Sequence, residues 1–126
     1  MTARIEKRCS KAAPMLGALL LWCVCGSAQA MSLRELATIH MRNSMGPALA
    51  EFYVIGVAEG LIEANEAGKR TGQAPLFCLA QDRWTPTQAN TLFNAEASRN
   101  ADVYEADMPV GLVMQQALIN TYPCEP

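Results

Sequence analysis

The sequence predicts an all-α protein: a compact bundle of about four to five helices held together by one disulfide. Three observations support this fold class. Apolar residues recur at three- and four-residue steps, as on one face of a helix, and no segment shows the alternation of a strand. Capping residues and prolines mark where helices begin and end. Hydrophobic residues make up 51% of the 126 residues, which is enough apolar material for one core.

The first thirty residues have the pattern of a secretory signal peptide. A cationic start is followed by the apolar run MLGALLLWCVC, and Ala28-Gln29-Ala30 supplies small residues at both positions that signal peptidase reads. The run is too short to span roughly 30 Å of hydrocarbon, so no permanent membrane anchor is expected, with a retained signal as the alternative. We expect cleavage after Ala30 and one exported domain at residues 31–126. That domain keeps eleven of the twelve acidic residues but six of the ten basic ones, so its formal net charge is −5.

Two helices are expected at the start of this domain. Ser32 and Glu35 have the spacing of a capping box, which predicts a first helix to about Arg42. Glycine and proline then interrupt the apolar pattern, and proline suits the first turn of the next helix. A second and longest helix is therefore expected at about residues 47–67, with Gly68 as its end.

The second helix carries two glycines one turn apart. Leu49, Phe52, Gly56 and Gly60 recur at three- and four-residue steps, which predicts that they share the packed side of the helix. A glycine inside a helix costs about 1 kcal/mol relative to alanine. Gly56 and Gly60 therefore indicate that another backbone crosses closely at this point.

The remainder of the chain is expected to hold two more helices and two connections. Residues 69–84 mix glycine, proline and polar residues and are expected to form a loop, in which Phe77 and its neighbours need burial. Thr85-Pro86-Thr87-Gln88 repeats the capping pattern and begins a third helix to about Ser98. A polar, acidic connection follows at residues 100–107. A final helix is expected at about residues 109–121.

Two cysteines, Cys78 and Cys124, remain after the predicted signal peptide. Their spacing matches neither a C-x-x-C redox motif nor a four-ligand zinc site. An even number of cysteines in an exported protein instead indicates a structural disulfide. By chain-entropy reasoning, closing a loop of this length stabilises the fold by roughly 4 kcal/mol.

Most functional classes that require particular chemistry are disfavoured. No basic stripe is present that could neutralise the phosphates of a nucleic acid. His40 is the only imidazole, and no nucleophile, glycine-rich phosphate loop, metal motif or haem motif accompanies it. The acidic residues are expected at solvent-facing helical positions rather than as catalytic pairs. The sequence therefore predicts no enzyme and no cofactor, and a function that a surface carries.

Several motifs together resemble the Tai-type immunity family, also called the resistance-associated proteins of type VI secretion. The aromatic-glycine-glycine helix at residues 52–60, the loop pair Phe77-Cys78, the capped helix that begins at Trp84-Thr85-Pro86, and the ending Ala117-Leu118-Ile119-Asn120-Thr121-Tyr122-Pro123-Cys124 occur in the family's order. The resemblance covers about residues 50–124. One departure is Leu79-Ala80, where relatives tend to have a proline after the cysteine.

The resemblance implies a helical, often dimeric protein of the periplasm that binds and blocks a peptidoglycan amidase. Such an inhibitor needs a protruding segment, which either residues 69–82 or residues 99–107 could supply. The second segment is richer in acidic residues and offers an aromatic anchor of the kind that binding hot spots favour. Its expected binding residues are Arg99, Asp102, Tyr104, Glu105 and Asp107. The alternative is a general periplasmic module, such as a chaperone, without a toxin-specific role.

Overall fold

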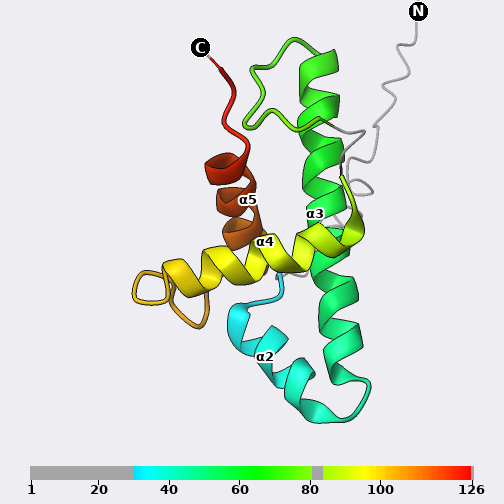
Figure 1. Cartoon of the computed structure of the whole chain (residues 1–126), viewed down its shortest axis with the longest axis vertical. Coiled ribbons are helices and arrows are strands. Elements are labelled where there is room, and N and C mark those ends of the chain that lie inside the picture. Colours follow the sequence, from blue (N-terminus) through cyan, green and yellow to red (C-terminus); the bar gives the residue numbers. More distant parts are fainter. Residues whose placement is uncertain (1–29, 81–83, 126) are drawn as a thin grey trace, which may run out of the picture.

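The computed structural model describes residues 30–80 and 84–125, so the predicted signal peptide lies outside the described residues except for Ala30. The described part is all helical, which confirms the predicted fold class. Its helices are α2 (Leu33–Arg42), α3 (Gly46–Arg70), α4 (Pro86–Arg99) and α5 (Val110–Thr121). α5 packs against α3, α4 crosses both, and α2 packs against α3 near its start (Figure 1). No helix within these residues is long and apolar enough to cross a membrane.

α2 begins as its sequence predicts. The Ser32 hydroxyl accepts a hydrogen bond from the Glu35 amide at 3.3 Å, and the Ser32 amide donates to the Glu35 carboxylate at 2.7 Å. Both halves of the capping box are therefore formed. The Ser32 hydroxyl also donates to the Glu35 carboxylate at 3.0 Å, and the hydrogen bonds from the Ser32 amide and hydroxyl lower the pKa of Glu35, because they stabilise its ionised form. The helix ends at Arg42, where it was expected to end.

α3 turns a different side to the core from the one that the sequence predicted. Its buried residues include Ala50, Val54 and Ala58, whereas Phe52 is 70% exposed. Gly56 and Gly60 are exposed as well, and a Cβ added to either would meet no atom within 4 Å. Among residues 30–80 and 84–125, no other segment crosses at these glycines, so the expected close approach is not found within this part of the chain.

The close backbone approach occurs at the start of α3 instead. A Cβ added to Gly46 would collide with the carbonyl oxygen of Ile39 and lie 2.8 Å from that of His40. Glycine is therefore required where the end of α2 meets the start of α3. The other end of α3 also differs, because the helix continues past Gly68 to Arg70. Gly72, with φ of 83°, supplies the left-handed conformation in the turn that follows.

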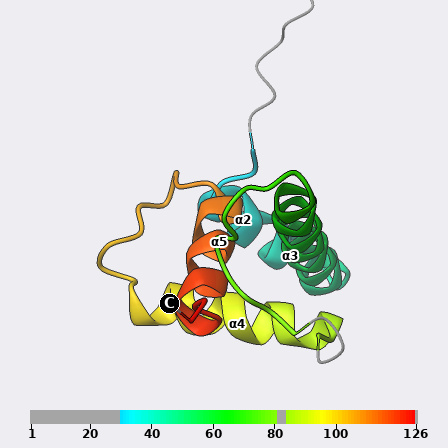
Figure 2. The same cartoon turned by 90° about the horizontal axis from the view of Figure 1, so that it is seen from above.

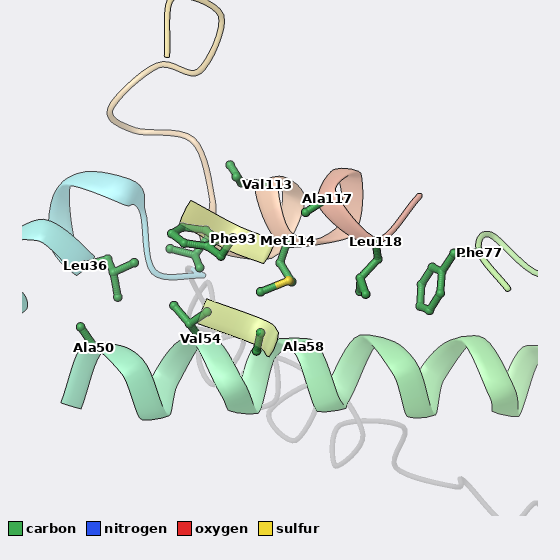
Figure 3. Packing of buried hydrophobic residues seen from close by; sticks show 12 residues of the cluster. Leu36, Ala50, Val54, Ala58, Phe77, Phe93, Val113, Met114, Ala117 and Leu118 are labelled. Carbon is green, nitrogen blue, oxygen red and sulfur yellow. The ribbon is translucent and has the colours of Figure 1, made fainter. Parts of the chain in front are cut away.

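The core lies along the inner side of α3, where all the other helices contribute to it (Figure 3). Leu36 of α2 covers Ala50 and Val54, and Phe93 of α4 lies above them. Met114 and Leu118 of α5 are completely buried farther along α3. Burial of side chains of this size stabilises a domain by about 2 kcal/mol each. These contacts fix the relative positions of α4 and α5, and so of the segment that joins them.

The first part of the connection from α3 to α4, residues 71–80, is held by several contacts; we call it the cystine loop. Its Phe77 is 1% exposed and fills the far end of the core. The buried Asn65 side chain donates to the Phe77 carbonyl at 3.0 Å and accepts from the Leu76 amide at 2.8 Å. Cys78 is bonded to Cys124, as predicted. The cystine loop is therefore part of the packed structure rather than a free surface segment.

Candidate functional site

The most prominent surface segment joins α4 to α5; we call residues 100–107 the acidic loop. It extends outward beyond the end of α4, away from the packed helices, in two perpendicular views (Figures 1 and 2). Asp102, Glu105 and Asp107 are exposed, and Val103 is 63% exposed between them. The loop therefore presents carboxylates around one apolar side chain.

The inner end of the acidic loop is fastened by a buried carboxylate, Glu96 of α4, which is 2% exposed. Its Oε1 accepts hydrogen bonds from the Tyr104 hydroxyl at 2.7 Å, from Asn100 Nδ2 at 2.8 Å and from Asn120 Nδ2 at 3.2 Å. Arg99 lies 3.4 Å from the other carboxylate oxygen. Burying a carboxylate is costly unless several donors compensate it, and here four side chains do so. Glu96 therefore joins α4, α5 and the acidic loop in one polar cluster.

Tyr104 belongs to this cluster and faces inward. Its burial, with the hydrogen bond to Glu96, raises the pKa of Tyr104 to about 12. The turn around it is fixed further by the amides of Val103 and Tyr104, which both donate to the Asn100 carbonyl at 3.0 and 3.1 Å. The ring is half-buried and its hydroxyl already has a partner, so Tyr104 holds the loop in shape.

The other end of the acidic loop is fastened to the start of α2. The amide of Arg34 donates to the Ala106 carbonyl at 2.8 Å, and that of Leu33 donates to Met108 at 3.0 Å. Arg34 Nε also lies 3.1 Å from the Asp107 carboxylate, in an exposed ion pair. Hydrogen bonds thus hold the loop at Tyr104 and near Asp107, while the side chains of Asp102, Val103 and Glu105 remain exposed.

The five residues expected to bind a partner lie within one segment, but the structure gives them different surroundings. Arg99 and Tyr104 contact Glu96, and Asp107 contacts Arg34. Asp102 and Glu105 are exposed. The acidic residues were expected at solvent-facing helical positions. This expectation is wrong for Glu96, which is buried. The burial of Glu96 could have been predicted from its position, because Glu96 follows Ala89 and Phe93 at three- and four-residue steps on the same side of α4.

A groove of about 500 Å³ runs beside this cluster, between α4 and the end of α5. Its lining residues include Thr85, Thr91, Leu92, Arg99, Thr121 and Tyr122. The Cys78 amide donates to the Tyr122 carbonyl at 2.8 Å, so the cystine loop supports one wall of the groove. The groove gives a partner that contacts the acidic loop a second, adjoining surface.

The described residues show no grouping suited to metal chemistry. Within residues 30–80 and 84–125, no three His, Cys, Asp or Glu side chains are placed to hold one metal ion together. His40 is exposed on α2. The arrangement that the structure does build, an ordered acidic loop beside a groove, is suited to binding another protein.

Comparison of the sequence with models of known protein families identifies one matching family. The model of the Rap1a immunity proteins matches residues 16–124, which is most of the chain. No curated protein and no solved structure matches significantly. The family comprises immunity proteins against effectors of type VI secretion, which agrees with the coarser part of the resemblance noted above. Members act by binding, so the chain is not an enzyme. This match over most of the chain places the protein in the Rap1a immunity protein family.

Proposed function

We propose that this protein is a periplasmic immunity protein that binds and blocks a peptidoglycan amidase effector of type VI secretion. Family membership supports the immunity role, and the Tai-type motifs of the sequence support an amidase as the target. The signal-peptide pattern of residues 1–30 and the disulfide support a periplasmic location, because disulfides persist in oxidising compartments.

The acidic loop is the segment that would block the enzyme. Peptidoglycan stem peptides carry carboxylates, so a cleft that accepts them must accommodate negative charge. Asp102 and Glu105 present such charges on a loop that Glu96 and Arg34 hold in place before binding. A preformed loop loses little conformational entropy when it binds, which favours affinity. This pre-ordering is the observation that carries the proposal.

Capture of the target provides the first test. The tagged full chain, exported to the periplasm of the producing cell, serves as bait for periplasmic and secreted proteins. We expect one peptidoglycan amidase in a fixed ratio, and we expect addition of the protein to stop its hydrolysis of purified peptidoglycan. Recovery of many weakly bound clients, or of an envelope complex without a hydrolase, would instead support the general periplasmic module.

Substitutions in the acidic loop then test the surface. Asp102→Asn with Glu105→Gln should weaken amidase binding about tenfold and reduce its salt dependence. Glu51→Gln with Glu125→Gln removes two exposed charges elsewhere and serves as the matched control. Alanine at Tyr104 and Glu105 should cost about 1 kcal/mol or more of binding free energy. Equal affinities of the loop variant and the control would exclude this loop as the inhibitory surface.

A further inference from the structure

The hydrophobic core is open to solvent at one end. Within the described residues, most core side chains are 0–1% exposed, but four of them are 3–8% exposed. These four lie together at the α2 end of the core and come from three helices (Figure 3): Leu36 of α2, Ala50 and Val54 of α3, and Phe93 of α4. They line one pocket of about 260 Å³, which we call the junction pocket. The pocket exists because α2 and α4 both pack on α3 and have few contacts with each other.

The rim of the junction pocket carries four polar side chains, which are His40, Glu51, Asn90 and Asn94. In the part of the chain that the structure describes, none of these side chains takes part in a hydrogen bond or an ion pair. The buried Glu96 is different, because its carboxylate accepts from several donors. Asn90 and Asn94 are one turn apart on α4, so both amides lie along the same opening. The rim therefore offers donors and acceptors that the folded chain leaves unused.

The charge and shape of the junction pocket favour a cation on an aliphatic stem. Glu51 is exposed and is the one carboxylate in the lining, which contains no lysine or arginine. The expected exported domain has a formal net charge of −5, which attracts cations as well. An aliphatic stem covers an apolar floor while its charged end stays at the solvated rim. The volume exceeds the roughly 150 Å³ of a cavity that holds benzene, so one long side chain fits.

Arginine suits the junction pocket better than lysine does. A guanidinium is planar and pairs with a carboxylate such as that of Glu51 through two parallel hydrogen bonds. Its remaining donors match the amide oxygens of Asn90 and Asn94, and Phe93 provides an aromatic ring in the floor. A lysine ammonium is more strongly hydrated and loses more when it approaches an apolar floor. An arginine within a polypeptide also lacks the α-carboxylate of the free amino acid, which Glu51 would repel.

We propose that the junction pocket binds the side chain of an arginine that a second protein partner presents, at a site separate from the acidic loop. Asn90 and Asn94 place the pocket beside the middle of α4, whereas the acidic loop extends beyond the end of that helix (Figure 1). The proposal does not rest on an amidase target, because a small arginine derivative tests it without any toxin. Loss of the arginine site should leave amidase inhibition unchanged, so the two proposals fail separately.

Titration of the full chain, exported to the periplasm and purified, with N-acetyl-arginine methylamide tests the pocket by NMR. We expect the backbone amide signals of Leu36, Glu51 and Asn94 to shift and to saturate with a dissociation constant on the order of 1 mM. The equivalent derivatives of citrulline, which has the same shape without the charge, and of lysine should bind at least about fivefold more weakly. Free arginine should also bind more weakly. No shift at these signals, or equal binding of any of the three comparison compounds, would overturn the proposal.

Two variants separate the pocket from folding. Glu51→Gln should weaken binding of the arginine derivative about tenfold, whereas Glu59→Gln, an exposed change elsewhere on α3, is the matched control and should bind like wild type. Ala37→Phe fills the pocket from an exposed position on α2, so it should abolish binding while the melting temperature stays near that of wild type. Wild-type affinity in Glu51→Gln, or saturable binding to folded Ala37→Phe, would overturn the proposal.

Discussion

The two loops that flank α4 are built on opposite principles. The cystine loop is held by the disulfide, by two hydrogen bonds to the side-chain amide of Asn65, and by burial of the Phe77 ring. The acidic loop is held by hydrogen bonds, including the one from Tyr104 to Glu96, and by an exposed ion pair at Asp107, while the side chains of Asp102, Val103 and Glu105 are exposed. The difference indicates a division of roles, in which one loop contributes stability and the other is available for recognition. Substitutions in the first should therefore change folding far more than binding.

The largest effect is expected from removal of the disulfide. Cys78→Ser with Cys124→Ser should lower the free energy of unfolding by about 4 kcal/mol, because the unfolded chain regains the entropy of an open loop. Denaturant titration measures this change, and the reduced wild-type protein should match the variant. Amidase affinity measured well below the melting temperature should stay within about threefold of wild type. A larger loss of affinity would mean that the two loops do not have separate roles.

The next largest effect concerns Asn65. Asn65→Ala leaves the Leu76 amide and the Phe77 carbonyl without their side-chain partner and removes a buried amide, at a cost of about 3 kcal/mol. Thermal unfolding measures the loss. Asn94→Ala, an exposed change on α4, is the control and should alter stability by less than about 0.5 kcal/mol. Equal melting temperatures for the two variants would show that the cystine loop is not held by this amide.

A smaller effect on stability is expected at Glu96, with a clearer effect on the acidic loop. Glu96→Gln introduces a donor among Tyr104, Asn100 and Asn120, which already donate, and should cost about 2 kcal/mol. Hydrogen exchange at the Val103 and Tyr104 amides should quicken in this variant, because their turn loses its anchor. Unchanged exchange at these amides would show that Glu96 does not order the loop.

The smallest effect is expected at the Tyr104 hydroxyl. Tyr104→Phe should cost about 1 kcal/mol near neutral pH, where the hydrogen bond to Glu96 is intact. Burial and the hydrogen bond to Glu96 raise the pKa of Tyr104 to about 12, whereas the unfolded chain keeps the usual tyrosine pKa of 10.0. The contribution of the hydroxyl is therefore complete below pH 10 and is lost as pH rises from 10 to about 12. Unfolding free energies of both proteins across this range test the trend, and a constant difference would contradict it.

Local signals were sufficient to predict the helices but not the directions in which their residues face. The α2 start and the α4 start follow from capping residues that act within four positions. The packed side of α3 was predicted wrongly because most residues of its first half are apolar, with Glu51 as the one charged residue, so periodicity alone does not choose a side. The acidic loop could be recognised from its composition. Glu96 and Asn120, which shape it, lie 24 residues apart in sequence, and their contact depends on how α4 packs on α5.

The disulfide also determines what happens to the protein when a protease cuts its backbone. Cys78 and Cys124 enclose α4, the acidic loop and α5 in one covalent ring. The exposed middle of the acidic loop is the kind of site that proteases nick. A single cut there opens the ring but leaves both fragments joined through the cystine, with α5 of one fragment still packed on α3 of the other. The segment offered to a toxin can thus be cleaved without the molecule separating into two pieces.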